Sequence, residues 1–319
     1  MSLRILMMGT GRFAVPTFQA LLDSDHTVVG LVTQPDRSAR SGRKHRNPMK
    51  ELAESHGHPV FQPPKINTEE GLTRLAEFQA DLCVVAAYGQ ILSAEVIGTP
   101  RLGFINVHAS LLPKYRGAAP IQHAIIRGET ETGVTIFQIE PKLDAGMILG
   151  SESIAIGPDE LYGALEERLS KVAGPLLVRV VDQIERGETD PQPQDPSAVT
   201  KARSFKKDFG LIDWSKSMHE VHCHIRGTQP WPRPFSYLHR PGHEPSRLLI
   251  LAVRPRDATD EPPGEPGAVR QVDGQLFVAC GDGWLPIETV QPGGKRPMEV
   301  DAFLRGNPMP EGSRFGREE

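Results

Sequence analysis

Short apolar runs alternate with amphipathic segments over the first 184 residues, and this alternation constrains the fold more than any other feature. Arg4–Met8 and Leu82–Ala86 are almost entirely apolar and predict buried strands. Phe13–Leu22 and Thr68–Phe78 carry apolar residues at helical spacing. Strands that alternate with helices in this way run parallel in one sheet with helices on both faces. The sequence therefore predicts an α/β domain built on a parallel sheet.

The pattern changes at Glu188–Ser197, a polar and proline-rich segment with the composition of a linker. Beyond it, Trp214–Arg226 predicts a helix, and short strand-like runs follow between Pro/Gly turns. These runs are Phe235–Leu238, Leu248–Val253, Gln275–Ala279 and Trp284–Val290. Such strands predict a small OB-like β-barrel, of the type that binds oligonucleotides. We therefore expect an α/β domain over residues 1–188, a linker over 189–208 and a C-terminal barrel over 209–319.

Composition narrows the class of protein. With 38% hydrophobic and 24% charged residues, the chain has the make-up of a globular protein. No apolar run approaches the roughly 20 residues that a membrane span needs. The N-terminal MSLRILMMG reads as a strand, not as an export signal, and three cysteines do not make a disulfide framework. We expect a cytoplasmic protein, monomeric and without a membrane partner.

A glycine loop, Gly9-Thr10-Gly11, follows the first predicted strand and opens a helix, as a dinucleotide-binding loop does. The third glycine of that fingerprint is missing, since the chain continues Arg12-Phe13-Ala14, and Asp36 lies beyond the second predicted strand. The sequence therefore disfavours a nicotinamide cofactor, and a tight turn explains the glycines.

A polar pair ends the predicted strand Phe104–His108. Asn106 and His108 are two residues apart, so both side chains leave the same face of the sheet. Ligands of open parallel sheets collect at the carboxyl ends of strands, where this pair is expected. From the residues alone, a functional pair and a hydrogen-bonded surface pair fit equally well.

The segments that follow carry a family resemblance. Asn106-Val-His108, then Ser110-Leu-Leu-Pro113 with Arg116-Gly117, then Asp144-Ala-Gly146, resemble the signature of folate-dependent formyltransferases. Other motifs are similar to the methionyl-tRNA formyltransferase family; they include Gln34-Pro35-Asp36-Arg37, Ala87-Tyr88-Gly89, Ile212-Asp213-Trp214 and Pro230-Trp231-Pro232. The resemblance implies a Rossmann-like domain followed by a small barrel. It also implies formyl transfer from 10-formyltetrahydrofolate to the methionine amino group of initiator methionyl-tRNA, for translation initiation.

The same resemblance assigns catalytic roles that suit acyl transfer through a tetrahedral species. The carboxamide of Asn106 suits a developing oxyanion. His108 can donate to that oxyanion or move the amine proton. Asp144 is expected to reach the imidazole and fix its tautomer. None of these roles needs a metal.

Folate-binding residues are implied in three stretches. The loop after the catalytic strand would shape the pocket, although a plain strand-to-helix loop is the alternative for that motif alone. The Tyr88–Leu92 loop and the Glu140–Asp144 segment would wall the pteridine. The expected folate residues are Ser110, Leu111, Leu112, Pro113, Tyr88, Gln90, Ile91, Leu92, Glu140 and Leu143.

Two basic segments are candidates for tRNA, although the formal net charge of −4 gives no hint of a nucleic-acid partner. The first lies between Gln34 and Lys50, where the family inserts a loop into the acceptor arm. The second falls in the predicted linker. Solvated surface segments are the alternative for both. The expected tRNA-binding residues are Arg37, Arg40, Arg43, Lys44, Lys206 and Lys207, with Arg40 and Arg43 both suited to the family's key arginine.

Other interpretations are weaker. His219, His222, Cys223 and His224 lack a second ligand pair elsewhere in the sequence, which disfavours a metal site. Trp214 and Trp231 are expected to lie in the barrel core or to pack against it, and base stacking is the weaker alternative. The rival functions are a sugar-nucleotide formyltransferase, a formyltetrahydrofolate hydrolase and a non-catalytic RNA-binding module. A binding module has no evident use for the triad of Asn106, His108 and Asp144.

Overall fold

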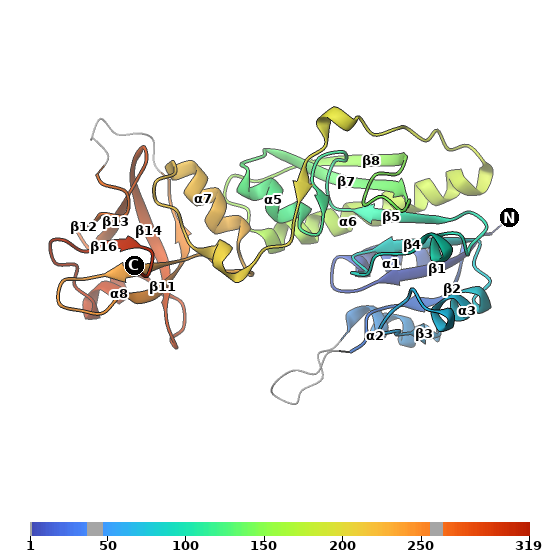
Figure 1. Cartoon of the computed structure of the whole chain (residues 1–319), viewed down its shortest axis with the longest axis horizontal. Coiled ribbons are helices and arrows are strands. Elements are labelled where there is room, and N and C mark those ends of the chain that lie inside the picture. Colours follow the sequence, from blue (N-terminus) through green and yellow to red (C-terminus); the bar gives the residue numbers. More distant parts are fainter. Residues whose placement is uncertain (1, 37–46, 256–263) are drawn as a thin grey trace. The chain divides into compact units, whose positions relative to one another are not determined.

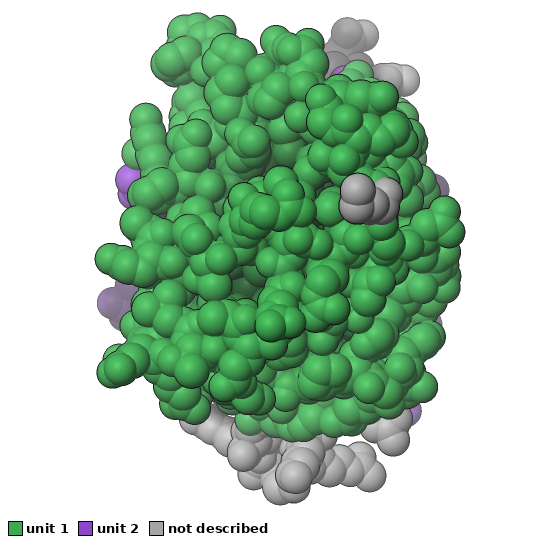
Figure 2. Space-filling model, turned by 90° about the vertical axis from the view of Figure 1, so that its right-hand side faces the viewer, with its two compact units in different colours: residues 1–120, 131–155, 166–202 green, residues 121–130, 156–165, 203–319 purple. Residues whose placement is uncertain are grey.

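The computed structural model describes residues 2–36, 47–255 and 264–319, which form two compact units (Figure 1). Unit 1 contains residues 1–120, 131–155 and 166–202, and unit 2 contains residues 121–130, 156–165 and 203–319. Figure 2 shows one face of unit 1 in green. The expected boundaries at residues 188 and 208 stay predictions. None of the helices within the described ranges is long and apolar enough to cross a membrane.

Unit 1 is built on a seven-stranded sheet with the order β3-β2-β1-β4-β5-β7-β8. The strands are β3 (Val60–Phe61), β2 (Thr27–Val32), β1 (Arg4–Gly9), β4 (Leu82–Ala86), β5 (Phe104–His108), β7 (Glu131–Gln138) and β8 (Ile148–Ala155). The first five in this order are parallel, as the sequence predicts. β7 and β8 are antiparallel additions, and β8 was not predicted because the middle of its sequence ILGSESIA is polar and exposed.

Helices cover both faces of this sheet. They are α1 (Ala14–Leu22), α2 (Pro48–Ser55), α3 (Glu69–Glu77), α4 (Ala94–Ile97) and the part of α6 (Tyr162–Arg186) that lies in unit 1, while α5 (Pro120–Ile126) belongs mainly to unit 2. The predicted cap of α2 is confirmed, because the Asn47 side chain accepts from the N–H groups of Met49 and Lys50. Gly174 lets α6 approach α1, since a Cβ there would lie 2.9 Å from Ala20 Cβ.

The core of unit 1 follows the alternation along the central strand β1. Leu6 and Met8 join an apolar cluster with residues from β4 and β5. Ile5 and Met7 are equally buried and face the opposite side, because successive strand residues alternate. A sheet that is apolar on both faces leaves its strand ends as the places for polar side chains.

Unit 2 contains an antiparallel, nearly closed barrel with the strand order β12-β13-β14-β11-β10-β16, and β15 pairs with β14. The strands are β10 (Phe235–His239), β11 (Ser246–Val253), β12 (Val269–Val272), β13 (Gln275–Cys280), β14 (Gly283–Pro292), β15 (Met298–Glu299) and β16 (Arg314–Gly316). A bridge between Ala268 and Arg314 brings the two edges together. The predicted barrel is therefore confirmed.

Two helices pack with the barrel, α7 (Met218–Gly227) and α8 (Val300–Gly306). Ser217 and Glu220 form a capping box at the start of α7, so this helix begins four residues later than the sequence predicts. Trp214 lies in the barrel core and donates its indole N–H to Ser236, which confirms the prediction for that residue. The prediction for Trp231 was wrong, because 53% of its surface is exposed.

Candidate active site

The polar pair lies where the sequence predicts it, at the carboxyl end of β5. Asn106 is half-buried and His108 is buried, with 6% of its surface exposed. Parallel β4 flanks them on one side, where Val85 pairs with Asn106, and antiparallel β7 on the other, where Thr135 pairs with His108. The pair therefore sits where the parallel sheet meets its antiparallel addition.

A backbone carbonyl orients the imidazole of His108. Nε2 lies 3.0 Å from the Tyr115 oxygen, and since a carbonyl only accepts, Nε2 carries the hydrogen. The Phe137 ring meets the imidazole edge-on, with 6.2 Å between ring centroids. The remaining ring nitrogen, Nδ1, is therefore the one with a lone pair when the imidazole is neutral.

The loop between His108 and Tyr115 is fixed by its own polar groups and by β7. Ser110 is fully buried and donates through Oγ to the Lys114 oxygen at 2.7 Å. Thr135 Oγ1 donates to the Ser110 oxygen at 2.7 Å and accepts from the Leu112 N–H at 3.1 Å. Ser110 therefore shapes the loop and does not present its hydroxyl to a ligand. Thr135 was missed by sequence reasoning, because no motif marks a threonine on a neighbouring strand as a support for this loop.

Asp144 has a different partner from the one predicted. One carboxylate oxygen, Oδ2, accepts from the Gly117 N–H at 2.8 Å. Within the described part of the chain, no hydrogen bond joins Asp144 to His108, so the expected direct contact is not formed. Both side chains bond instead to one short segment, His108 to Tyr115 and Asp144 to Gly117. Asp144 also has a left-handed backbone, with φ of 48°, a conformation that is uncommon outside glycine and that Asn and Asp adopt more often than other residues do.

Two of the expected folate residues turn inward. The Tyr88 ring lies in the apolar cluster of unit 1, where burial raises the pKa of its hydroxyl to about 12. Its hydroxyl has no hydrogen-bond partner among the described residues. The Gln90 side chain accepts from the Ile66 N–H at 2.9 Å and faces the Pro63 and Pro64 carbonyls. Both side chains are therefore engaged within unit 1.

Other expected folate residues remain accessible. Ile91 is 76% exposed and Leu143 is 61% exposed, which is unusual for large apolar side chains. Glu140 is also exposed, whereas Leu92 is buried in the apolar cluster and Leu112 is buried as well. Ile91 and Leu143 thus offer apolar surface on the two segments that were predicted to wall the pteridine.

The predicted tRNA-binding residues divide into two groups. Arg37, Arg40, Arg43 and Lys44 lie outside the described residues. Lys206 and Lys207 are exposed. They lie between Phe205 and Phe209 in the sequence. The two phenyl rings have centroids 4.4 Å apart and contact the imidazoles of His123 and His224 in unit 2. This ladder of rings holds the segment in place while both ammonium groups face water.

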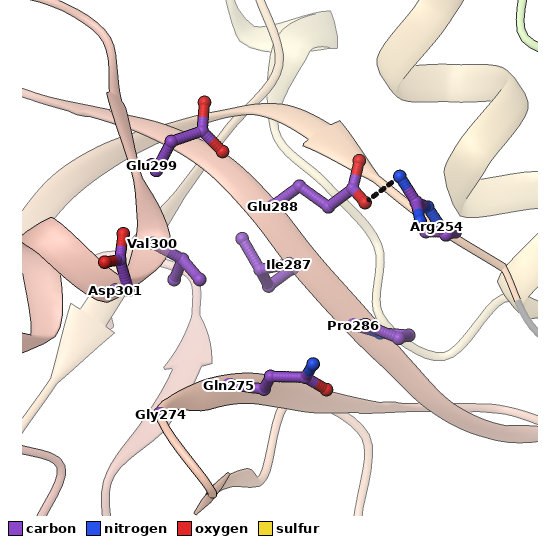
Figure 3. Close-up of a pocket in the computed structure, with 9 residues that line it drawn as sticks. All are labelled: Arg254, Gly274, Gln275, Pro286, Ile287, Glu288, Glu299, Val300 and Asp301. Atoms are coloured by element: carbon purple, nitrogen blue, oxygen red, sulfur yellow. Dashed lines mark ion pairs between the residues drawn. The ribbon is translucent and has the colours of Figure 1, made fainter.

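A cavity of about 250 Å³ opens on the barrel of unit 2 (Figure 3). Three carboxylates line it, those of Glu288, Glu299 and Asp301, against one guanidinium. Arg254 pairs with Glu288 at 2.7 Å, the contact drawn in Figure 3. An acidic lining repels phosphates, so this cavity does not suit a nucleic-acid backbone.

The histidines of α7 serve packing. His222 lies 3.2 Å from Asp159, and the Cys223 sulfur lies 3.6 Å from His219 Nε2 and 3.3 Å from Arg226 Nη2. Burial and the neighbouring Arg226 lower the pKa of His222 to about 4. Over residues 2–36, 47–255 and 264–319, no three His, Cys, Asp or Glu side chains are grouped so that they could hold a metal ion.

Comparisons with known proteins agree with this architecture. The family model "Formyl transferase" matches residues 1–181, and "Formyl transferase, C-terminal domain" matches residues 204–308. The chain therefore belongs to the formyl transferase family, a family of enzymes. Within it, the chain is 41% identical to "Methionyl-tRNA formyltransferase" of Parvibaculum lavamentivorans, over 95% of this chain and 97% of the relative. The protein of that name from Methylococcus capsulatus is also 41% identical, over 98% of this chain and 100% of the relative.

Solved structures share the fold at lower identity. The sugar 3N-formyltransferase WlaRD, crystallised with dTDP and 5-N-formyl-THF, superposes with a TM-score of 0.65 at 17% identity over 93% of this chain and 100% of that one. The N-formyltransferase from Helicobacter canadensis, in complex with folinic acid and dTDP-3-aminofucose, superposes with a TM-score of 0.65 at 17% identity. The match covers 90% of this chain and 98% of that one. HypX from Aquifex aeolicus superposes with a TM-score of 0.63 at 16% identity over 96% of this chain. The matched region is about half (48%) of HypX.

Proposed function

We propose that this chain transfers the formyl group of 10-formyltetrahydrofolate to the α-amino group of methionine on initiator tRNA, as a monomer in the cytoplasm. The main support is the Asn106–His108 pair at the end of β5. The chain that carries this pair aligns with methionyl-tRNA formyltransferases over 95–98% of its length. The folate donor is supported by the formyl-folates named with two structures of the same fold.

The proposed chemistry uses both members of the pair. The methionine nitrogen forms a bond to the formyl carbon, and the Asn106 carboxamide donates to the oxygen that becomes negative. Because the hydrogen on His108 Nε2 is held by Tyr115, Nδ1 is the atom that takes the proton from the attacking amine. The carbon–nitrogen bond to the folate then breaks, and the same proton passes to the departing folate nitrogen. Each step uses only these side chains and the two substrates.

Asp144 acts in this proposal as a positioning residue. Its carboxylate holds the Gly117 N–H, two residues from the carbonyl that orients His108. A shift of Tyr115 would turn the imidazole away from the substrate amine. Misplacement by about 1 Å at a reacting group can cost about 10²-fold in rate, so a carboxylate outside direct contact still matters.

For tRNA we propose contacts from both basic segments. Lys206 and Lys207 are exposed, and ring contacts of Phe205 and Phe209 hold the segment that carries them, which suits binding to phosphates. Arg37, Arg40, Arg43 and Lys44 would supply the contact in the acceptor arm. We place the formyltransferase domain at residues 1–188, the linker at 189–208 and a tRNA-binding barrel domain at 209–319.

An acceptor assay tests the proposal. Purified protein and radiolabelled 10-formyltetrahydrofolate are incubated with methionyl initiator tRNA, with dTDP-3-aminofucose, or with buffer alone. We expect label on the tRNA, removed by mild deacylation as formylmethionine. Label on the sugar nucleotide would replace this function with that of a sugar N-formyltransferase. Free formate in all three tubes would indicate a hydrolase.

A further inference from the structure

The Gln194 side chain connects the two halves of the proposed site from a segment that the sequence marks only as linker. It is buried, with 9% of its surface exposed. Its Nε2 donates to the backbone oxygens of Asp144 at 3.0 Å and Gly146 at 2.8 Å. Its Oε1 accepts from Arg116 through Nε at 3.0 Å and Nη2 at 2.7 Å. A carboxamide has two N–H donors and two lone pairs, so all four are engaged.

These bonds close a ring of contacts around the catalytic loops. Arg116 and Gly117 form β6, which pairs in parallel with β9 (Lys201–Ala202). The turn at Asp144 is bonded to this strand twice, once directly through Gly117 and once through the Gln194 carboxamide and Arg116. The backbone of Gln192 pairs with Ile148 on β8, which places Gln194 between the turn and the strand.

We infer that Gln194 is a positioning residue for Asp144, and through β6 for His108, in the proposed formyl transfer. Asp144 has a left-handed backbone, a conformation that is uncommon for residues other than glycine, so hydrogen bonds to its neighbours help to hold it. Two hydrogen bonds from one buried donor group to the carbonyls on either side of Ala145 fix that turn. The inference rests on the proposed function for its rate measurements.

The Gln194 side chain must be a carboxamide, because its nitrogen faces two carbonyl acceptors and its oxygen faces a guanidinium donor. Gln194→Glu places a second acceptor against two carbonyl oxygens, while its bond to Arg116 is kept. Gln194→Met keeps the length and apolar volume but satisfies neither end, which leaves buried polar groups without partners. Gln194→Glu therefore isolates the turn at Asp144, and Gln194→Met tests the whole bridge.

The experiment compares both variants with Gln192→Met. The Gln192 side chain is exposed and donates to the Asp190 oxygen of its own segment at 3.3 Å. Initial rates are measured with formyl-folate and methionyl initiator tRNA. We expect kcat to fall about 10- to 100-fold in both Gln194 variants, with KM for either substrate within about threefold and the control unchanged. Parallel changes in KM alone, or wild-type kcat in Gln194→Glu, would overturn the inference.

A double variant separates positioning from general weakening of the fold. If Gln194 acts through Asp144, then adding Gln194→Glu to Asp144→Ala lowers kcat by less than about threefold more. Independent, multiplying losses would refute the coupling.

A second readout does not depend on the substrate. Amide hydrogen exchange at Gly117 should speed up at least tenfold in Gln194→Glu and stay unchanged in Gln192→Met, because the Gly117 N–H bonds the turn that Gln194 holds. Fast exchange in a protein that formylates no tRNA would support the bridge and reject the proposed function. Unchanged exchange would reject the bridge even if tRNA is formylated.

Discussion

The loops around His108 and the cavity of the barrel both gather polar side chains, but they treat them in opposite ways. Around His108, buried and half-buried side chains bond to backbone carbonyls and N–H groups that lie 7 to 50 residues away in the sequence. At the barrel cavity, charged side chains pair with each other near water, as Arg254, 73% exposed, pairs with Glu288. The first arrangement fixes atoms in place, and the second leaves them solvated.

This difference predicts different costs of substitution. A buried group that loses its partner costs about 1–3 kcal/mol, and misplacement at a reaction centre costs rate as well. An exposed ion pair contributes about 0–1 kcal/mol. Substitutions around His108 should therefore be visible in turnover, and substitutions at the cavity should be nearly silent.

The largest effect is expected for His108→Ala, which removes the proposed proton-transfer group. We expect kcat to fall about 10²–10⁴-fold with an intact fold. Glu299→Gln, the matched change at the cavity, should leave kcat within about twofold. Rates are measured with methionyl initiator tRNA, and thermal unfolding monitors the fold. Near-normal turnover in His108→Ala would remove this residue from the mechanism and erase the contrast between the two regions.

A smaller effect is expected at Asp144, which bonds to the loop and not to the imidazole. Asp144→Ala removes the acceptor for the Gly117 N–H, and we expect kcat to fall about 10²-fold. Asp144→Asn keeps an oxygen acceptor at the same position, so its loss should be about tenfold. Equal losses in the two variants would show that the negative charge matters, and would favour the direct contact with His108 that the family resemblance implied.

The next effect concerns tRNA affinity. Changing Lys206 and Lys207 together to Gln should weaken binding and lower the slope of log affinity against log salt by about 2, since each phosphate contact contributes about 1. Changing Glu288 and Glu299 to Gln at the cavity should weaken nothing. Filter binding of initiator tRNA at several salt concentrations measures both. An unchanged slope would show that the two lysines belong to a solvated segment that does not contact tRNA.

Neutralising Arg40, Arg43 and Lys44 together is expected to lower the slope of log affinity against log salt in the same way.

A buried histidine outside the site should make the fold sensitive to acid. Burial and Arg226 lower the pKa of His222 to about 4, whereas an unfolded histidine titrates near about 6.5. The folded state thus favours the neutral ring. This contribution is complete above about pH 6.5 and is lost as the pH falls towards about 4. Urea unfolding between pH 4 and 7 should show a shallower pH dependence for His222→Gln than for the wild type, and parallel curves would contradict the assignment.

Features that depend on neighbouring residues could be predicted from the sequence, and contacts between distant residues could not. Local patterns found β4 and β5, the Asn47 cap and the alternation that buries both faces of the sheet. The start of α7 was predicted four residues too early, at Trp214, although Ser217 and Glu220 have the spacing of a capping box. Strand β8 has too little apolar alternation to be recognised.

The contacts of the site were less predictable. Asn106 and His108 follow from one strand and its end. The partner of Asp144 lies 27 residues away, and Gln194 reaches the same turn from 50 residues further along the chain. Sequence spacing carries no signal for such contacts, because the fold alone decides which loops meet. The inward turn of Tyr88 was missed for the same reason.

The smallest effect tests the inward turn of the Tyr88 side chain. The Tyr88 hydroxyl lies in an apolar cluster without a partner among the described residues, so Tyr88→Phe should raise the free energy of unfolding by about 1 kcal/mol. The pKa of Tyr88, raised to about 12 by burial, adds a pH signature. An unfolded tyrosine titrates near about 10, so the wild type loses stability between about pH 10 and 12, and the variant loses less. Tyr237→Phe is the control, because that hydroxyl is hydrogen-bonded to Glu318 and should not gain. Urea unfolding at pH 8 and 11 measures the free energy of unfolding of both variants. If Tyr88→Phe is less stable than the wild type, the Tyr88 hydroxyl has a hydrogen-bond partner in the folded protein.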